Sequence, residues 1–75
     1  MLTETDIIAG CKQYQRAAQM ALYKKYVGKM NAIAYRYTNS YEDAKDIVQN
    51  GFIKVFSSIN QFKGTGSVEG WIRRI

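Results

Sequence analysis

The fold of this chain is decided by residues 40–59, which read SYEDAKDIVQNGFIKVFSSI. Apolar residues recur in this stretch at steps of one, three and four positions, so they lie on one face of a helix with 3.6 residues per turn. The members of this stripe are Ala44, Ile47, Val48, Phe52, Val55, Phe56 and Ile59. The stretch is therefore predicted to be a helix whose striped face packs on a core.

A second stripe of the same kind lies upstream. Its members are Tyr23, Tyr26, Val27, Met30, Ile33, Ala34 and Tyr37. The pattern predicts a long helix from about Lys12 to Tyr37, with Tyr37 in the core. Gly28 is its expected weak point because glycine has a low helix propensity. The chain contains no proline, the strongest helix breaker, to interrupt it.

Turn and cap formers separate the two helices, namely Thr38, Asn39 and Ser40. Ser40 followed by Asp43 three residues later has the spacing of a capping box, which marks the start of the second helix. Because the link between the two striped helices is short, they are expected to pack as an antiparallel hairpin.

Shorter helices are expected on both sides of the hairpin. Thr3 or Thr5 can cap a short helix that ends near Gly10. On the other side, residues 63–66 read KGTG and form a loop, and Ser67 caps a last helix. The sequence thus predicts an all-α fold, a small bundle of about four helices.

The length of 75 residues allows one domain only. A core in so short a chain is small, so we expect modest stability. The helical pattern after Ser67 runs to Ile75 without a C-cap signal, and residues 1–75 are therefore expected to be a fragment of a longer protein.

The composition excludes several classes of protein. The chain has 11 Lys+Arg against 6 Asp+Glu, a net charge of +5, with no histidine and one cysteine. Without histidine, Ser-His-Asp and Cys-His chemistry is excluded, a zinc site has almost no ligands, and the lone Cys11 cannot form a disulfide within the chain. We therefore expect no enzyme, no metal and no cofactor.

The same composition favours a cytoplasmic protein with an anionic partner. No apolar run approaches the roughly 18–20 residues of a membrane span, and residues 1–10 lack the basic start of a secretory signal. The positive net charge favours nucleic acid as the partner.

Four short motifs, in this order and at this spacing, resemble region two of bacterial RNA polymerase sigma factors, most closely the extracytoplasmic-function (ECF) class. They are DAKDIVQ at 43–49, FIKVF at 52–56, FKG at 62–64 and WIRRI at 71–75. The resemblance implies a domain that docks on the RNA polymerase core and recognises and melts the minus-ten promoter element. It also implies an anti-sigma factor as a partner, and a separate domain, absent from these residues, for the minus-thirty-five element.

In the family, the helix that carries the D-x-x-Q stretch binds the coiled coil of the beta prime clamp of the polymerase. The matching residues here are Asp46, Gln49 and Asn50, and Asn50 departs from the glutamate that the family often has. They are three and four positions apart and share one helical face, with Ile47 and Val48 expected to point toward the core. From the residues alone, a solvated face explains the pattern better, and it is the resemblance that favours docking.

In the family, the loop and the last helix read the minus-ten DNA, and in the ECF class the loop accepts a base flipped out of the non-template strand. The matching residues are Phe62, Lys63, Gly64, Thr65, Gly66, Ser67, Arg73 and Arg74. Glycines let the backbone approach a base closely, and arginine meets phosphate or guanine with two hydrogen bonds. A flexible connector and a solvated helix end are the alternatives, and Trp71 is expected to be mainly structural.

A second hypothesis is a small helical protein–protein adaptor without DNA binding. The two apolar stripes would then serve only the core or a partner helix. The ordered motifs, and the glycine loop that leads into the Trp-Ile-Arg-Arg segment, favour the sigma-like hypothesis because an adaptor has no need of them.

Overall fold

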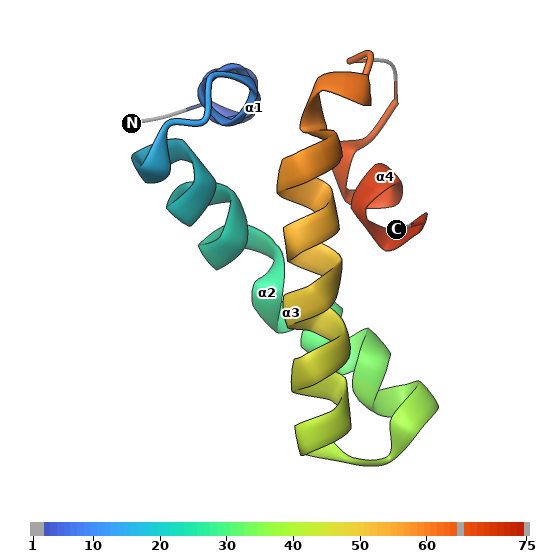
Figure 1. Cartoon of the computed structure of the whole chain (residues 1–75). Coiled ribbons are helices and arrows are strands. Elements are labelled where there is room, and N and C mark those ends of the chain that lie inside the picture. Colours follow the sequence, from blue (N-terminus) through green and yellow to red (C-terminus); the bar gives the residue numbers. More distant parts are fainter. Residues whose placement is uncertain (1–2, 65, 75) are drawn as a thin grey trace.

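The structure is a computed structural model that describes residues 3–64 and 66–74. Within these residues the chain forms helices and no strand (Figure 1). The helices are α1 (Glu4–Lys12), α2 (Arg16–Thr38), α3 (Tyr41–Ser58), the short 3-10 helix η1 (Ile59–Gln61) and α4 (Val68–Arg74). The predicted all-α bundle of about four helices is confirmed.

Capping decides where α1 begins. The Thr3 hydroxyl accepts a hydrogen bond from the backbone N–H of Asp6 at 3.1 Å, and the Asp6 carboxylate accepts one from the N–H of Thr3 at 3.3 Å. These reciprocal bonds form a capping box, so Thr3 and not Thr5 is the cap.

The long second helix does not start at Lys12, and the prediction is wrong at this end. Tyr14 has a φ of 59°, a left-handed conformation that terminates α1, and α2 begins only at Arg16. The N–H of Gln15 donates to the Gly10 carbonyl oxygen across this reversal at 3.0 Å. The apolar periodicity does not predict this break, because a single left-handed tyrosine leaves the spacing of apolar residues on both sides unchanged.

The helices α2 and α3 form the expected antiparallel hairpin, with the turn at the bottom of Figure 1. Asn39 ends α2 in a left-handed conformation with a φ of 54°, and its N–H donates to the Tyr35 carbonyl oxygen at 2.8 Å. The Ser40 hydroxyl then accepts a hydrogen bond from the N–H of Asp43 at 3.3 Å and so caps α3. Upstream of this turn, α2 runs through Gly28 without interruption.

Buried residues at steps of three and four positions form the core between these helices, and every step in α2 is four. The buried row of α2 is Ala18, Leu22, Tyr26, Met30 and Ala34. The buried residues of α3 are Ala44, Val48, Phe52 and Val55. Rows at this spacing are the ridges that interlock when two helices pack. Ile7 and Cys11 of α1, Ile59 of η1, and Val68 and Ile72 of α4 complete the core.

Two residues of the predicted stripes lie outside this core. Tyr37 is 86% exposed and Ile47 is 53% exposed, so their expected burial is wrong, whereas the burial of Val48 is confirmed. Both exposed residues follow a buried alanine by three positions. A stripe with a period of 3.6 contains the third and the fourth position alike. After Ala44 the fourth position, Val48, is buried and the third is not, whereas after Phe52 the third position, Val55, is buried.

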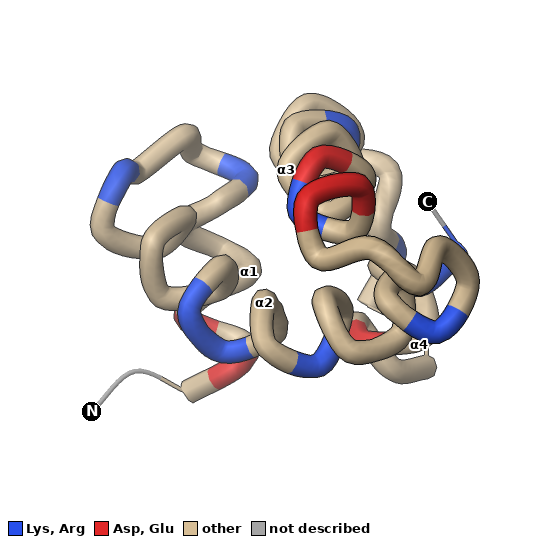
Figure 2. Tube along the Cα trace, turned by 90° about the horizontal axis from the view of Figure 1, so that it is seen from below, with Lys and Arg blue, Asp and Glu red and all other residues tan. Residues whose placement is uncertain are grey.

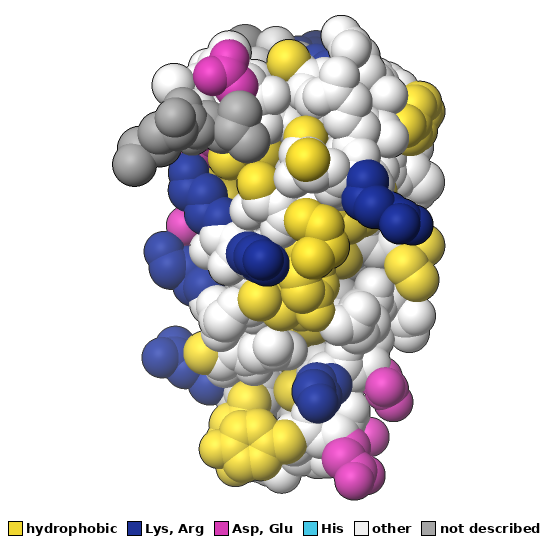
Figure 3. All heavy atoms as spheres, turned by 90° about the vertical axis from the view of Figure 1, so that its left-hand side faces the viewer, with side chains coloured by type: hydrophobic (Ala, Val, Ile, Leu, Met, Phe, Trp, Pro, Cys, Tyr) yellow, Lys and Arg dark blue, Asp and Glu magenta, His cyan; other side chains and the backbone are white. Residues whose placement is uncertain are grey.

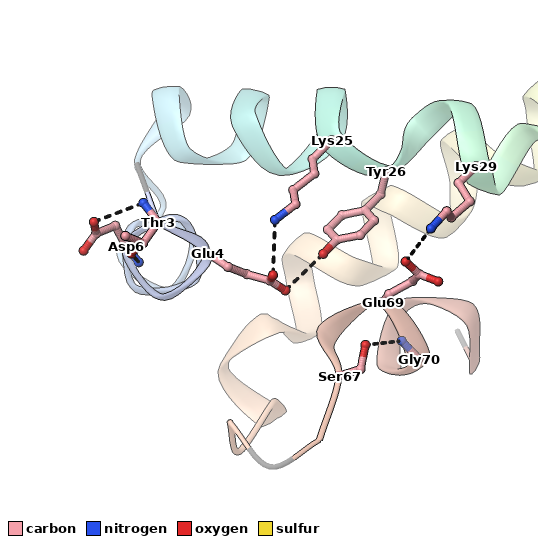
Figure 4. A network of polar contacts seen from close by, with 9 residues as sticks. All are labelled: Thr3, Glu4, Asp6, Lys25, Tyr26, Lys29, Ser67, Glu69 and Gly70. Atoms are coloured by element: carbon pink, nitrogen blue, oxygen red, sulfur yellow. Dashed lines mark hydrogen bonds and ion pairs between the residues drawn. The ribbon is translucent and has the colours of Figure 1, made fainter. Parts of the chain in front are cut away.

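Polar contacts attach α1 and α4 to α2 (Figure 4). The Glu4 carboxylate accepts hydrogen bonds from Lys25 at 3.1 Å and from the Tyr26 hydroxyl at 3.0 Å, and Lys29 pairs with Glu69 at 2.9 Å. Figure 2 shows acidic residues side by side at the start of α3, while basic residues are spread over the rest of the trace. None of the helices in the described part of the chain is long and apolar enough to cross a membrane.

Candidate functional site

The polar face of α3, defined here as Asp46, Gln49 and Asn50, is exposed along its whole length. The amide nitrogen of Gln49 donates a hydrogen bond to the Tyr23 hydroxyl on α2. This contact fixes the Gln49 side chain across the groove between the two helices. Asp46 forms no ion pair with any residue in the described ranges, so its carboxylate is available to a partner.

Apolar residues border this polar face. Ile53 on α3 is 66% exposed and Met20 on α2 is 49% exposed. A shallow hollow between the two helices is lined by Arg16, Met20, Tyr23, Gln49 and Phe56. Figure 3, seen from the left-hand side of Figure 1, shows hydrophobic side chains in the middle of the molecule with Lys and Arg side chains around them. Such an apolar centre with a charged rim is typical of a protein-binding surface.

The loop after η1 combines a buried start with an exposed remainder. Phe62 is buried, and its ring lies 5.5 Å from the ring of the half-buried Trp71. Lys63 is exposed, and Gly64 and Gly66 have φ angles of 78° and 75°, which glycine adopts without strain. The side chain of Phe62 thus supports the loop from the core and does not face solvent. Thr65, predicted to contact DNA, lies outside the described residues.

The helix α4 begins where the sequence predicted. The Ser67 hydroxyl accepts a hydrogen bond from the N–H of Gly70 at 3.3 Å, which caps the helix. Arg73 and Arg74 are exposed at the other end, where the side chain of Arg74 donates to the Gly70 carbonyl oxygen at 3.4 Å. Trp71 packs against the core, as expected of a structural residue.

The two candidate surfaces lie on different sides of α3. Gln49 borders the hollow that α3 shares with the first half of α2, whereas Ile47 borders an apolar groove that also contains Arg73. The structure therefore does not bring the polar face of α3 together with the loop and the arginines of α4.

One contact near the loop was missed by sequence reasoning. The ammonium group of Lys12, at the end of α1, donates to the Phe62 carbonyl oxygen at 2.8 Å. A second hollow lies between α1 and the loop, with Thr5 and Lys12 on one side and Gly64 and Gly66 on the other. Neither feature has a local signal, because the two sides are about 50 residues apart in the chain.

Burial shifts the titration of two groups beneath these surfaces. It raises the pKa of Tyr26 to about 12, and the hydrogen bond to Glu4 adds to the effect. It also raises the pKa of the Cys11 thiol, which favours the unreactive protonated form. Within the described residues, no cluster of three acidic, cysteine or histidine side chains could hold a metal ion.

Comparison with known proteins shows which family this chain is similar to. Residues 22–75 match the family described as Sigma-70 region 2. The chain is similar to the ECF RNA polymerase sigma factor SigE of Mycolicibacterium smegmatis, with 35% identity over 72% of this chain and 21% of the relative. It is also similar to the ECF RNA polymerase sigma-E factor of Haemophilus influenzae, with 32% identity over 99% of this chain and 39% of the relative.

A further relative is the RNA polymerase sigma-H factor of Pseudomonas aeruginosa, with 28% identity over 100% of this chain and 40% of the relative. The chain thus spans between 21% and 40% of the length of these three relatives. No solved structure gives a significant match. The family match begins within α2 and includes α3, the polar face, the loop and α4, and the chain belongs to the sigma-70 region 2 family of RNA polymerase sigma factors, in the ECF class.

Proposed function

We propose that this chain is the part of a transcription initiation factor that docks on the RNA polymerase core and captures the minus-ten promoter strand. The observation that carries the proposal is the polar face of α3. Its three residues occupy the family's docking positions and are exposed, while the neighbouring Val48 and Phe52 are buried. The proposed work is binding alone, without a catalysed reaction, and takes place in the cytoplasm.

The proposed partner of the polar face is the coiled coil of the beta prime clamp. Asp46 offers a carboxylate to a basic side chain, and Asn50, one helical turn further on, offers an amide. Gln49 is held by Tyr23 before any partner arrives, so less side-chain freedom is lost on binding. The exposed Ile53 extends the same face by a further turn and supplies apolar area.

The docking proposal is tested with the isolated clamp coiled coil. Replacing Asp46 by Asn and Gln49 by Ala in one protein removes a charge and an amide, and we expect affinity to fall at least about tenfold, which corresponds to about 1.4 kcal/mol. Glu42→Gln is the matched control, because it removes one charge from the same helix outside the polar face. Unchanged affinity of the double variant, measured by titration calorimetry, would contradict the docking role.

The proposed DNA surface consists of the loop and the far end of α4. Lys63 and the two arginines supply positive charge, and the glycines leave the loop backbone open to a base. Unstacking a base costs a few kcal/mol, so we propose that the loop binds a base of the non-template strand that has already left the duplex. Because Phe62 is buried, we propose that its ring supports the loop from the core and does not contact DNA.

Family membership implies two further features, which we include in the proposal. One is an anti-sigma factor as a regulatory partner. The other is a single domain formed by residues 1–75, with the minus-thirty-five element bound by a separate domain of a longer protein. The greater length of the three relatives is compatible with such a domain.

The adaptor hypothesis gives a different result in the same two assays. A sigma-type domain binds the clamp coiled coil and also binds single-stranded DNA with a steep dependence on salt concentration. An adaptor binds a protein partner only. Clamp binding without any affinity for single-stranded DNA would therefore favour the adaptor.

A further inference from the structure

The helix α1 lies outside the residues that match the family, yet it faces the loop directly. It forms one wall of the hollow whose other wall includes Gly64 and Gly66. The α1 side of this hollow presents the apolar side chains of Ile8 and Ala9 and the hydroxyl-bearing Thr5. An apolar surface beside a few polar groups is the usual lining of a pocket for a small planar group.

The contact between Lys12 and Phe62 holds the loop at its start. Phe62 is the last residue before the loop, and its carbonyl oxygen accepts the half-buried Lys12 ammonium at 2.8 Å. A hydrogen bond from a charged donor is stronger than one between neutral groups. At the other end, the Ser67 hydroxyl is fixed by the N–H of Gly70. The glycines between these two anchors are permissive, so the anchors decide where the loop backbone lies.

Acidic charge at the edge of the hollow is already neutralised. Glu4 borders the hollow, but its carboxylate turns toward α2 and binds Lys25 and the Tyr26 hydroxyl (Figure 4). A nucleotide that enters between α1 and the loop therefore meets little repulsion from this carboxylate. From the sequence of α1, its two acidic residues Glu4 and Asp6 are expected to repel an anionic strand. The pairing of Glu4 reduces this repulsion beside the hollow.

We propose that α1 is part of the single-strand site: its exposed side forms the second wall of the pocket for an unstacked base, and Lys12 positions the loop that forms the first wall. This inference rests on the proposed function and extends it to a helix that the family match does not contain. Ile8 and Ala9 lie against the base, and Thr5 is placed to bind its edge. Lys12 contributes through the loop and not through a phosphate.

The first test fills the hollow. In the full chain, Ala9→Tyr adds a ring on the wall of the hollow, and Gln13→Tyr adds the same ring at an exposed position outside it. The probe is a single-stranded 12-mer with six randomised central positions, and sequencing of the bound fraction gives the base preference at each position. We expect Ala9→Tyr to lower the strongest preference at least about fivefold and Gln13→Tyr to leave it within about twofold. Equal preferences in the two variants would overturn the inference.

The second test separates positioning from charge. We expect Lys12→Met to lower the base preference at least about fivefold and to leave the slope of log K against log salt unchanged, while Lys12→Arg restores the preference. A slope that falls by about 0.7, with the preference intact, would mean that Lys12 contacts a phosphate and would overturn the positioning role. Helical circular dichroism and clamp affinity must match the wild type in every variant used.

The wild-type result distinguishes a failure of the proposed DNA binding from a failure of the proposed role of α1. If the wild type binds the library with no base preference, the DNA half of the proposed function fails and this inference fails with it. If the wild type has a preference that both Ala9→Tyr and Lys12→Met retain, the proposed function stands and only the role of α1 is refuted.

Discussion

Gly10 and Gly28 respond in opposite directions to the same substitution. A Cβ at Gly10 would lie 2.5 Å from the Cβ of Ala18 and 3.0 Å from the side-chain oxygen of Gln15, whereas a Cβ at Gly28 meets nothing within 4 Å. Ala18 is buried, and its Cβ is attached directly to the backbone of α2 and cannot rotate away. We therefore expect Gly10→Ala to destabilise the protein and Gly28→Ala to stabilise it.

The magnitudes follow from two opposing effects. Alanine inside a helix is favoured over glycine by about 1 kcal/mol at most, and this is the full effect expected at Gly28. Overpacking a close contact costs about 1–3 kcal/mol, and the short distance to a backbone-anchored Cβ at Gly10 places the cost in the upper half of that range. The free energy of unfolding should fall by about 1–2 kcal/mol in Gly10→Ala, with each kcal/mol shifting Tm by about 4–8 °C.

Urea unfolding of the two variants measures these changes, and a third variant tests their cause. Ala18→Gly removes the methyl group that the new Cβ would strike, so the double variant Gly10→Ala with Ala18→Gly should lose less stability than the sum of the single changes. We expect a coupling above about 1 kcal/mol. Additivity within about 0.5 kcal/mol, the result for independent sites, would refute the steric explanation, as would stabilisation by Gly10→Ala alone.

Three further predictions concern the core, the loop and the alkaline limit of stability. Ile59→Ala empties a fully buried position and should cost about 2–5 kcal/mol in urea unfolding. Lys63→Gln should leave Tm unchanged and reduce the salt slope of single-strand binding by about 0.7, if Lys63 contacts one phosphate. The folded state raises the pKa of Tyr26 from 10.0 to about 12, so the stability that depends on the neutral hydroxyl is complete below pH 10 and is lost as the pH rises toward 12. Thermal melts of Tyr26→Phe should lack this alkaline loss, and a parallel decline in both proteins would contradict the assignment.

Apolar periodicity predicted the hairpin because α2 and α3 bury regular rows. Local cap chemistry predicted Ser40 and Ser67 and narrowed the first cap to Thr3 or Thr5, because each cap accepts from an N–H three residues away. The same reasoning failed at Tyr14, where one left-handed residue ends α1. It also failed at Lys12, whose partner Phe62 is distant in the chain. Contacts between helices depend on which side of an apolar stripe packs against the neighbouring helix, and the apolar pattern of a single sequence does not specify that side.

The same limit applied to the candidate sites. The family positions on α3 and in the loop were found from the sequence because they fall within short motifs. Their exposure, the hold of Tyr23 on Gln49, and the burial of Phe62 followed only from the packing of α3 on α2 and of α4 on the core. The wall that α1 contributes could not be predicted at all, since its residues carry no motif.

The placement of acidic residues differs between the two surfaces that we propose for a protein partner and for DNA. Glu4 on α1 and Glu69 on α4 are each paired with a lysine of α2 (Figure 4), so among the acidic residues of these two helices only Asp6 lacks an ion pair within the described residues. The acidic residues of α3, whose positions on the trace lie together in Figure 2, form no ion pair within the described residues. At surface exposure such pairs contribute little to stability. Their larger effect is on the field around the molecule: α2 pairs with Glu4 and Glu69 on the side proposed for DNA, whereas the carboxylates of α3 stay available to the proposed protein partner.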